Sequence, residues 1–253
     1  MSIIVAYKYA GNPQDAKVSS DGVVDWARVK KAVSEYDPVA VELAKSLAAE
    51  GAGEVVGVCV GGADVASSLA KKNALSKGLD RALVVADDAT ADWSNTQTAA
   101  ALAELVKRVD DVKAVFTGDA SVDEGAGVMG PLLAGALGWP CLLEVLSVET
   151  AGDGVKIRQR TESGTRTVET SGPVVLSAAT DAVEVKAASM KEILAAGKKP
   201  LETVALADLT VAEVGRNVQA ARQPEMRERK KMVFEGDNAA AQLIDALKAD
   251  GIL

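Results

Sequence analysis

Three short, almost wholly apolar segments constrain the fold of this chain more than any other feature. They are residues 3–7, 55–60 and 112–117. Strands that are apolar on both faces are typical of parallel sheets covered by helices on both sides. Between these segments, apolar residues recur every three or four positions, as they do in amphipathic helices. The sequence therefore predicts an α/β fold with a doubly wound, mostly parallel sheet.

Turn-forming residues mark the limits of several further elements. Asp37 followed by Pro38 predicts the N-cap and first position of a helix, which we expect to end at Gly51. An Asp-Gly pair predicts the turn of a small hairpin over residues 18–24. Residues 82–85 are expected to form one more strand of the sheet.

The last part of the chain departs from this alternation. Residues 141–145, 155–160 and 165–170 alternate apolar and polar side chains and are separated by glycine turns, which predicts an antiparallel hairpin extension. Three further elements are expected after it, namely a buried strand, a short helix and a last amphipathic helix, over residues 173–178, 189–196 and 239–247.

A polar and basic stretch, residues 215–231, predicts an extended arm rather than a core element. We therefore expect two parts in the chain. The first is an α/β domain over residues 1–200 that includes the hairpin extension. The second is a C-terminal arm and helix over residues 201–253.

The composition excludes several classes of function. A formal net charge of −8 argues against a nucleic-acid partner, and the absence of histidine removes Ser-His-Asp, Cys-His and His-metal sites. Cys59 and Cys141 are interpreted as small buried hydrophobic residues, and two cysteines without a metal-binding pattern favour a cytoplasmic protein. The first apolar segment is too short for membrane insertion.

The carboxyl ends of the predicted parallel strands are where a ligand is expected. These ends lie at residues 6–8, at residues 60–62 and at Gly118, where a glycine-rich loop over residues 118–130 begins. Backbone N–H groups of such a loop could bind a phosphate. The loop is neither a Walker loop nor a GxGxxG fingerprint, so tight turns and packing are an equally good explanation of its glycines.

The acidic residues of this loop have two open interpretations. Asp119, Asp123 and Glu124 could bind a ribose hydroxyl or a metal ion. They could equally be solvated or cap the following helix. A phosphate nearby requires that these carboxylates point away from it.

Several segments resemble the β subunits of electron-transfer flavoproteins, most closely the FixA type. The opening residues 4–8, the segment 34–42, and the loop over residues 118–130 with the Trp139-Pro140 that follows it all match family segments. The most specific match is Ser189-Met190-Lys191 with Ile193-Leu194 and the run to Pro200. The tail, at residues 227–229 and 233–237, is also similar to the FixA tail.

The resemblance implies a Rossmann-like fold of the adenine nucleotide hydrolase-like type and the role of an electron carrier rather than an enzyme. It implies an α (FixB-type) subunit as partner, contacted by the C-terminal arm, and an FAD shared with that subunit. Electrons would pass between an acyl-CoA-dehydrogenase-like or FixC-type flavoprotein and a quinone or ferredoxin-linked acceptor. AMP, or a second FAD if the protein bifurcates electrons, would bind in the β subunit itself.

The resemblance also implies which residues form two sites, and it implies no catalytic residue and no metal ligand. The nucleotide pocket would comprise Ala6, Ser34, Glu35, Tyr36, Asp37, Val60, Gly118, Asp119, Asp123, Glu124, Gly125, Ala126, Gly127, Val128 and Met129. The loop that docks the partner flavoprotein would comprise Lys186, Ser189, Met190, Lys191, Ile193 and Leu194, with Met190 as the apolar anchor.

The chain departs from the family pattern inside the nucleotide loop. Gly127-Val128-Met129 stands where the family commonly has Asn-Gln-Thr or a Gln-rich equivalent, so backbone donors alone would hold a phosphate. The second pocket segment has Ser34-Glu35 in place of Asn-Pro. The choice between AMP and a second FAD is therefore open. The alternative function is an ATP- or AMP-binding module of the universal-stress or adenine nucleotide hydrolase type.

Overall fold

The computed structural model describes residues 1–26, 28–212, 219, 224–225 and 230–253. The chain forms two compact units, Met1–Ala221 and Arg222–Leu253. Most of the predicted basic arm, residues 215–231, lies outside the described residues, and so do Arg227, Glu228 and Arg229 of the tail.

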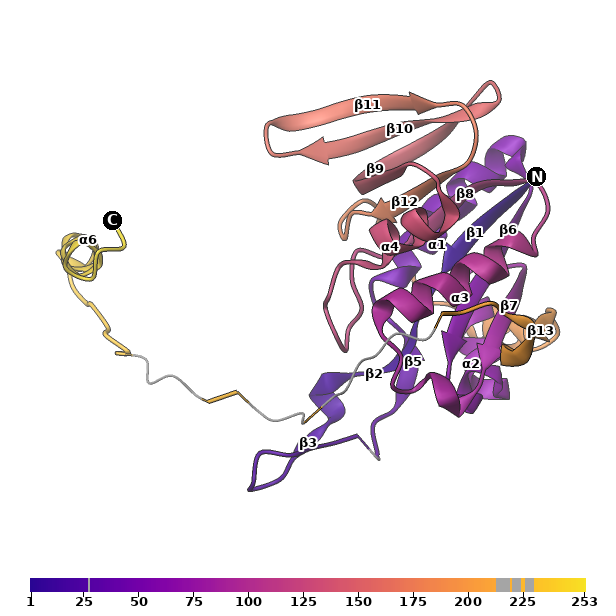
Figure 1. The fold of residues 1–253 in the computed structure, drawn as a ribbon. Helices are drawn as coiled ribbons and strands as arrows, with labels where there is room; N and C mark the ends of the chain where they lie inside the picture. Colours follow the sequence, from indigo (N-terminus) through magenta and orange to yellow (C-terminus); the bar gives the residue numbers. More distant parts are fainter. Residues whose placement is uncertain (27, 213–218, 220–223, 226–229) are drawn as a thin grey trace. The chain divides into compact units, whose positions relative to one another are not determined.

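The first unit is built on a nine-stranded sheet with the strand order β11-β10-β9-β12-β8-β1-β6-β7-β13 (Figure 1). All pairings between β9 and β13 are parallel. The chain begins on the central strand, moves outward to β6 and β7, and returns to β8 on the other side of β1. The sheet is thus a mostly parallel, doubly wound sheet of the Rossmann-like type, as the apolar segments predict. Its strands are β1 (Ser2–Ala6), β6 (Glu54–Gly61), β7 (Arg81–Ala86), β8 (Val112–Thr117), β9 (Cys141–Ala151), β10 (Gly154–Thr161), β11 (Gly164–Thr170), β12 (Val174–Ala178) and β13 (Leu201–Thr203).

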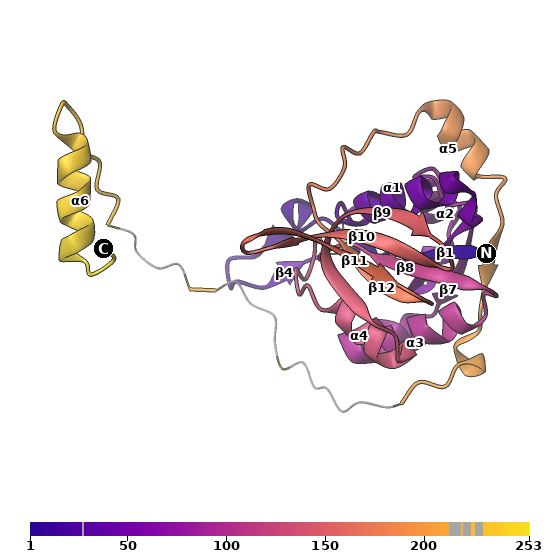
Figure 2. The same ribbon diagram turned by 90° about the horizontal axis from the view of Figure 1, so that it is seen from above.

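Helices cover both faces of the sheet (Figure 2). On one face lie α1 (Asp37–Leu47) and α2 (Ser68–Leu75), and on the other lie α3 (Asn95–Lys107) and α4 (Met129–Leu137). Alternate residues of each strand point to opposite faces, so β1 sends Ile3 and Val5 into the α1 core and Ile4 and Ala6 into the α3 core. This double burial explains why the strands read as continuous apolar segments.

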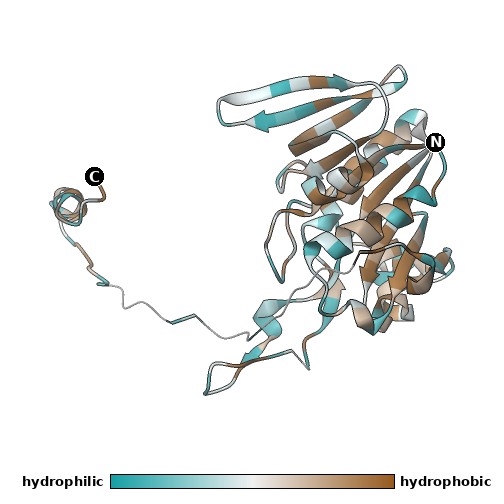
Figure 3. Ribbon diagram, viewed as in Figure 1, coloured by the Kyte–Doolittle hydropathy of each residue, from teal (hydrophilic) through white to brown (hydrophobic). Residues whose placement is uncertain are grey.

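The hairpin extension is present where the sequence predicts it. β9, β10 and β11 pair antiparallel, while β9 joins the rest of the sheet through β12. Figure 3 shows polar colours on much of β10 and β11, in contrast to the apolar strands at the centre of the sheet. In the first half of β10 buried and exposed residues alternate, which accounts for the alternating pattern in the sequence, whereas the outermost strand β11 is largely exposed.

Small elements complete the first unit. The predicted hairpin at the Asp-Gly pair is confirmed as β3 and β4, and a second two-stranded sheet pairs β2 with β5. The predicted short helix is α5, whose capping box joins Ser189 and Glu192. The bounds of these elements are Tyr9–Gly11 for β2, Lys17–Val18 for β3, Val24–Asp25 for β4, Lys31–Val33 for β5 and Met190–Ala196 for α5.

One predicted helix start is wrong. Asp37 is the first residue of α1 rather than its N-cap. The N-cap residue is Tyr36, whose side chain makes no capping hydrogen bond. The carboxylate of Asp37 is buried and turned toward the end of β1 instead. The sequence pattern of Asp before Pro is the same in both arrangements, so local sequence alone could not separate them.

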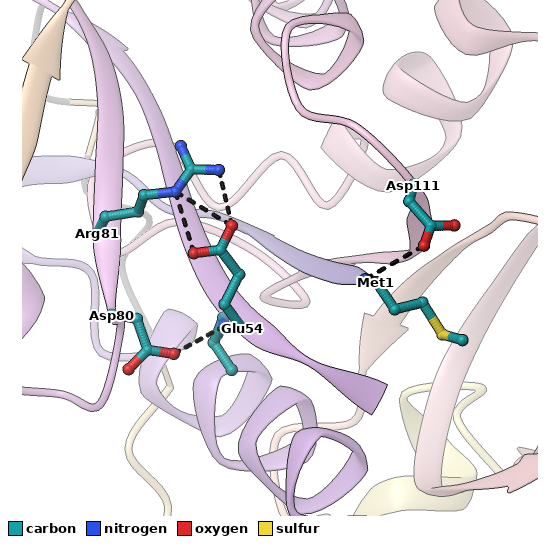
Figure 4. A network of polar contacts seen from close by, with 6 residues as sticks. Met1, Glu54, Asp80, Arg81 and Asp111 are labelled. Atoms are coloured by element: carbon teal, nitrogen blue, oxygen red, sulfur yellow. Dashed lines mark hydrogen bonds and ion pairs between the residues drawn. The ribbon is translucent and has the colours of Figure 1, made fainter. Parts of the chain in front are cut away.

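Polar contacts join the amino ends of the central strands (Figure 4). Arg81 at the start of β7 binds both carboxylate oxygens of Glu54 at the start of β6, and Asp80 accepts a hydrogen bond of 2.9 Å from Val55 N–H. The terminal ammonium of Met1 lies 3.2 Å from the carboxylate of Asp111. These contacts lie at the opposite end of the strands from the cavity described below.

The second unit contains α6 (Ala239–Ala249), which extends two residues beyond the predicted helix. Leu243 and Ile244 of this helix are exposed, and Lys230 pairs with Asp250 within the unit. No helix in the described part of the chain is both long enough and apolar enough to cross a membrane.

Candidate functional site

A cavity of about 260 Å³ opens at the carboxyl ends of β1, β6 and β8. The strand order reverses between β1 and β8, because the chain first adds β6 and β7 on one side of β1 and then β8 on the other. Ligands of doubly wound proteins bind at the carboxyl ends of the strands at such a point. The residues that line the cavity come from the ends of these strands, the loop after β8, the start of α4, and the segment between β7 and α3. They are Ala6, Tyr7, Lys8, Tyr9, Asp37, Val60, Gly61, Gly62, Thr90, Ala91, Trp93, Asn95, Thr98, Leu102, Thr117, Gly118, Asp119, Ala120, Ser121, Asp123, Glu124, Ala126, Gly127, Val128 and Met129.

Asp37 joins the two strand ends on either side of the reversal point. Its Oδ2 accepts a hydrogen bond of 2.7 Å from the N–H of Lys8, which directly follows β1. Burial raises the pKa of this carboxyl to about 7, although the N–H groups of Lys8 and Gly118 and the Lys8 charge favour the ionised form. The side chain is therefore a buried link between α1, β1 and β8 at the wall of the cavity.

Lys8 holds the acidic part of the loop. Its Nζ lies 2.8 Å from Asp123 Oδ2 and 3.5 Å from Glu124 Oε1. Burial alone would raise the pKa of Asp123, but hydrogen bonds from Lys8 and Ser121 outweigh it and hold that pKa below its usual value. Two carboxylates thus share the ammonium group, which draws their charge to one side of the cavity.

The start of α4 leaves polar groups available to a ligand. No side chain caps this helix, whose N-cap residue is Val128. Beside its first turn, the hydroxyl of Thr117 is buried and has no hydrogen-bond partner among the described residues. A Cβ placed on Gly130 would come within 3.2 Å of that hydroxyl oxygen, so the glycine keeps the helix backbone close to it. An uncapped helix start beside an unpaired hydroxyl is suited to an anion.

Most of the predicted nucleotide-site residues meet at this cavity. Ala6, Asp37, Val60 and the loop residues Gly118, Asp119, Asp123, Glu124, Ala126, Gly127, Val128 and Met129 line it. Ser34, Glu35, Tyr36 and Gly125 do not.

Ser34 has a different place in the structure. It is buried, and its hydroxyl oxygen accepts a hydrogen bond of 3.1 Å from the N–H of Val122. The side chain therefore anchors the loop rather than facing the cavity. Tyr36 packs close to the loop as well, because a Cβ on Gly118 would lie 3.0 Å from Tyr36 backbone carbon.

The wall formed by the β7–α3 segment was missed in the sequence. Thr90, Trp93, Asn95 and Thr98 line this side of the cavity. The signal was available, since residues 82–85 were expected to be a parallel strand and its carboxyl end must reach the same edge. No glycine cluster follows that strand, so its end carries no local sequence sign of a ligand site.

The predicted docking residues lie outside the cavity lining. Met190 and Leu194 of α5 are exposed at 71% and 63%. Lys186, Ser189, Lys191 and Ile193 flank them on the same segment, and the capping box fixes the start of the helix. The arrangement presents two apolar side chains on a short, well-defined helix.

Side-chain chemistry at the cavity is limited. Burial raises the pKa of Cys59 to about 12, so its thiol stays protonated and unreactive. Burial also raises the pKa of Tyr7, which keeps its phenol neutral. Among the described residues, no group of three or more His, Cys, Asp and Glu side chains could hold a metal ion. The uncapped start of α4 and the unpaired hydroxyl of Thr117 suit the cavity to an anionic ligand.

The chain matches the family model described as "Electron transfer flavoprotein domain" over residues 21–209, about three quarters of its length. The matched region contains every element of the cavity except β1 and the residues directly after it.

Proposed function

Because the chain belongs to the electron transfer flavoprotein domain family, we propose that it is the FixA-type β subunit of a heterodimeric electron carrier of the cytoplasm. In this role it pairs with an α (FixB-type) subunit and shares an FAD with it. The FAD accepts electrons from a flavoprotein dehydrogenase and passes them to a quinone or ferredoxin-linked acceptor. The side chains of this chain bind and orient, and they form no bond with substrate.

The observation that carries the nucleotide part of this proposal is the unpaired hydroxyl of Thr117 beside the uncapped start of α4. A buried hydroxyl without a partner costs about 1–3 kcal/mol. Thr117 lines the cavity, where a ligand can supply that partner. A phosphate oxygen is a suitable acceptor, and the backbone N–H groups of the glycine loop add further donors. Thr117 thus supplies a side-chain contact that Gly127-Val128-Met129 lack.

The size of the cavity favours AMP over a second FAD as the nucleotide of this chain. A volume of about 260 Å³ lies at the lower limit of ligand pockets, which commonly reach several hundred cubic ångströms. A mononucleotide suits such a space better than a dinucleotide. We therefore propose a simple carrier with AMP, and a bifurcating protein with two FAD groups is the competing outcome.

Two exposed apolar surfaces supply the partner contacts in this proposal. The apolar face of α6, with Leu243 and Ile244, contacts the α subunit as part of the arm over residues 201–253. The α5 surface, with Met190 and Leu194, docks an acyl-CoA-dehydrogenase-like or FixC-type flavoprotein. Burial of such side chains in an interface contributes about 1.5–3 kcal/mol each.

The test is to co-express the chain with its α subunit, purify the pair, denature it, and count FAD and AMP by absorbance and chromatography. One FAD and one AMP per heterodimer is the expected result. Two FAD groups per heterodimer would support the carrier function and would mean that the cavity binds the second FAD instead of AMP. A properly assembled pair without flavin would overturn the carrier function and leave the ATP- or AMP-binding module as the better explanation.

A further inference from the structure

The cavity has two chemically different walls. One wall is the glycine loop with Thr117 and the start of α4, which offers hydrogen-bond donors to a phosphate. The other is formed by the segment between β7 and α3, with Thr90 and Trp93, and by the first turns of α3, with Asn95 and Thr98. Nothing in the family resemblance assigns a role to this second wall.

The local structure fixes the position of the second wall. A 3₁₀ turn at residues 88–90 follows β7, and the N–H of Trp93 donates to the carbonyl of Thr90 at 3.1 Å. Ser94 then forms a capping box with Gln97, which begins α3 directly after Trp93. Trp93 therefore lies directly before the N-cap of α3, in a short turn whose backbone is held by hydrogen bonds.

One face of α3 continues this wall into the cavity. Asn95, Thr98 and Leu102 are spaced by three and four residues, which places them on the same side of the helix, and all three line the cavity. The amide of Asn95 and the hydroxyl of Thr98 can each donate and accept hydrogen bonds. Leu102 and Val60 add apolar surface.

We infer that this wall binds the base of the nucleotide, with Trp93 stacking on the adenine ring and Asn95 and Thr98 bonding to its edge. The nucleotide then crosses the ends of the strands, with its phosphate at Thr117 and its base at α3. This inference rests on the proposed function and specifies how AMP is oriented and recognised. Stacking of a base on an aromatic ring contributes about 1–3 kcal/mol to binding. The amide of an asparagine can donate to and accept from the edge of adenine at the same time.

The positions of Ser34 and Tyr36 support this orientation. The family resemblance assigns the segment 34–37 to the nucleotide pocket, but only Asp37 of that segment lines the cavity. The hydroxyl of Ser34 already accepts the N–H of Val122. Of the three aromatic residues that line the cavity, Tyr7 and Tyr9 follow β1, whereas Trp93 follows β7, on the opposite side of β6 from β1.

The test compares Trp93→Ala with wild type in the full-length chain freed of nucleotide. AMP and ribose 5-phosphate are titrated separately by calorimetry, and thermal unfolding is followed to establish that each variant folds. We expect the Kd for AMP to rise about tenfold in the variant, because one base–aromatic stack is lost. The Kd for ribose 5-phosphate should not change, since that ligand lacks the base.

A matched control and a second readout complete the test. Trp26→Ala removes an indole that is 45% exposed and outside the cavity, so it should leave both affinities unchanged. In a Trp26→Phe and Trp139→Phe background, AMP should quench the fluorescence of Trp93, the remaining indole.

The outcomes separate this inference from the proposed function. Equal AMP affinity in wild type and Trp93→Ala would overturn the base position while the carrier function stands. Loss of ribose 5-phosphate binding in the variant would also overturn it, because Trp93 would then act on the phosphate end. If wild type bound no AMP, both the base position and the AMP part of the proposed function would fail, while flavin content would still decide the carrier role.

Discussion

The carboxylate of Asp37 accepts a hydrogen bond of 2.7 Å from the backbone N–H of Lys8. These residues are 29 positions apart, at the start of α1 and just beyond β1. Because Gly118 also approaches this carboxylate, a single buried side chain links both strand ends at the point where the sheet reverses direction. The stability of the cavity wall should therefore depend on the protonation of Asp37.

We predict that Asp37→Asn flattens the dependence of stability on pH. The folded state raises this pKa to about 7 from 3.8, so between these values the folded chain holds a proton that the unfolded chain releases. The contribution of this group is present below about pH 4 and is lost as the pH rises through about 7. From pH 5.5 to 8, wild type should lose on the order of 1–3 kcal/mol relative to the variant in denaturant unfolding. Parallel pH curves for the two proteins would contradict the assignment.

We predict that Gly118→Ala destabilises the chain. A Cβ at this position would lie 2.6 Å from Asp37 Oδ1 and 3.0 Å from Tyr36 backbone carbon, and both are held in place. A loss of about 1–3 kcal/mol is expected in denaturant unfolding. Gly135→Ala is the control, because its Cβ meets nothing within 4 Å in the middle of α4, and it should be neutral or stabilise by up to about 1 kcal/mol. Equal effects of both substitutions would show that the strand ends can move freely.

We predict that Thr117→Val separates stability from ligand binding. The valine keeps the shape of the side chain and removes a buried hydroxyl that lacks a partner, so the nucleotide-free chain should be as stable as wild type or more so. AMP affinity should fall, by about tenfold if one charged hydrogen bond is lost. Thr170→Val is the control, since Thr170 also has a buried hydroxyl with no partner among the described residues and lies on β11, outside the cavity. Calorimetric titration of AMP that gives the same Kd for both variants would remove Thr117 from the phosphate site.

We predict that Lys8→Gln weakens nucleotide binding with little effect on the fold. The Lys8 ion pairs with Asp123 and Glu124 are partly exposed and should contribute less than about 1 kcal/mol to stability. Without the ammonium, both carboxylates repel an incoming phosphate, and the Kd for AMP should rise several-fold, most clearly at low salt. Lys107→Gln breaks an ion pair with Glu104 that lies on α3 outside the cavity, and it serves as the control. An unchanged affinity at low salt would mean that the acidic side chains do not face the ligand.

We predict that Met190→Glu slows electron transfer from the partner dehydrogenase. The side chain is 71% exposed, so the substitution should leave the fold and the cavity unchanged. A buried charge in the interface should weaken docking by tenfold or more, visible as a higher KM for the carrier in a steady-state assay. Val23→Glu is the control, because Val23 is 47% exposed on the β3–β4 hairpin. Identical kinetics for the two variants would place the docking surface elsewhere.

The sequence was a good guide to elements whose burial leaves a periodic pattern. The segments at β1, β6 and β8 are apolar on both faces because both faces are covered. The alternation in the first half of β10 reflects one buried and one exposed face. The predicted helix over residues 189–196 begins with a capping box between Ser189 and Glu192, which is complete within four residues. In each case the physical cause acts locally along the chain.

Features that depend on distant residues were not predictable in this way. Asp37 looks like a helix cap until its partner at Lys8 is known. The family resemblance predicts Ser34 as a nucleotide-site residue, but it gives no sign of the hydrogen bond from Val122, which spans 88 residues. Trp93 carries no local sign of a ligand site, because its place beside the cavity follows from the order of the strands.

The uncapped start of α4 has a consequence for the life of the chain in the cell. A ligand that supplies the missing hydrogen bonds of that turn and of Thr117 also stabilises the folded state of the chain. Ligand binding then raises the free energy of unfolding in proportion to the logarithm of its concentration. Newly made chains in a nucleotide-poor cell would be cleared faster by proteases, so the abundance of this protein would follow the nucleotide supply.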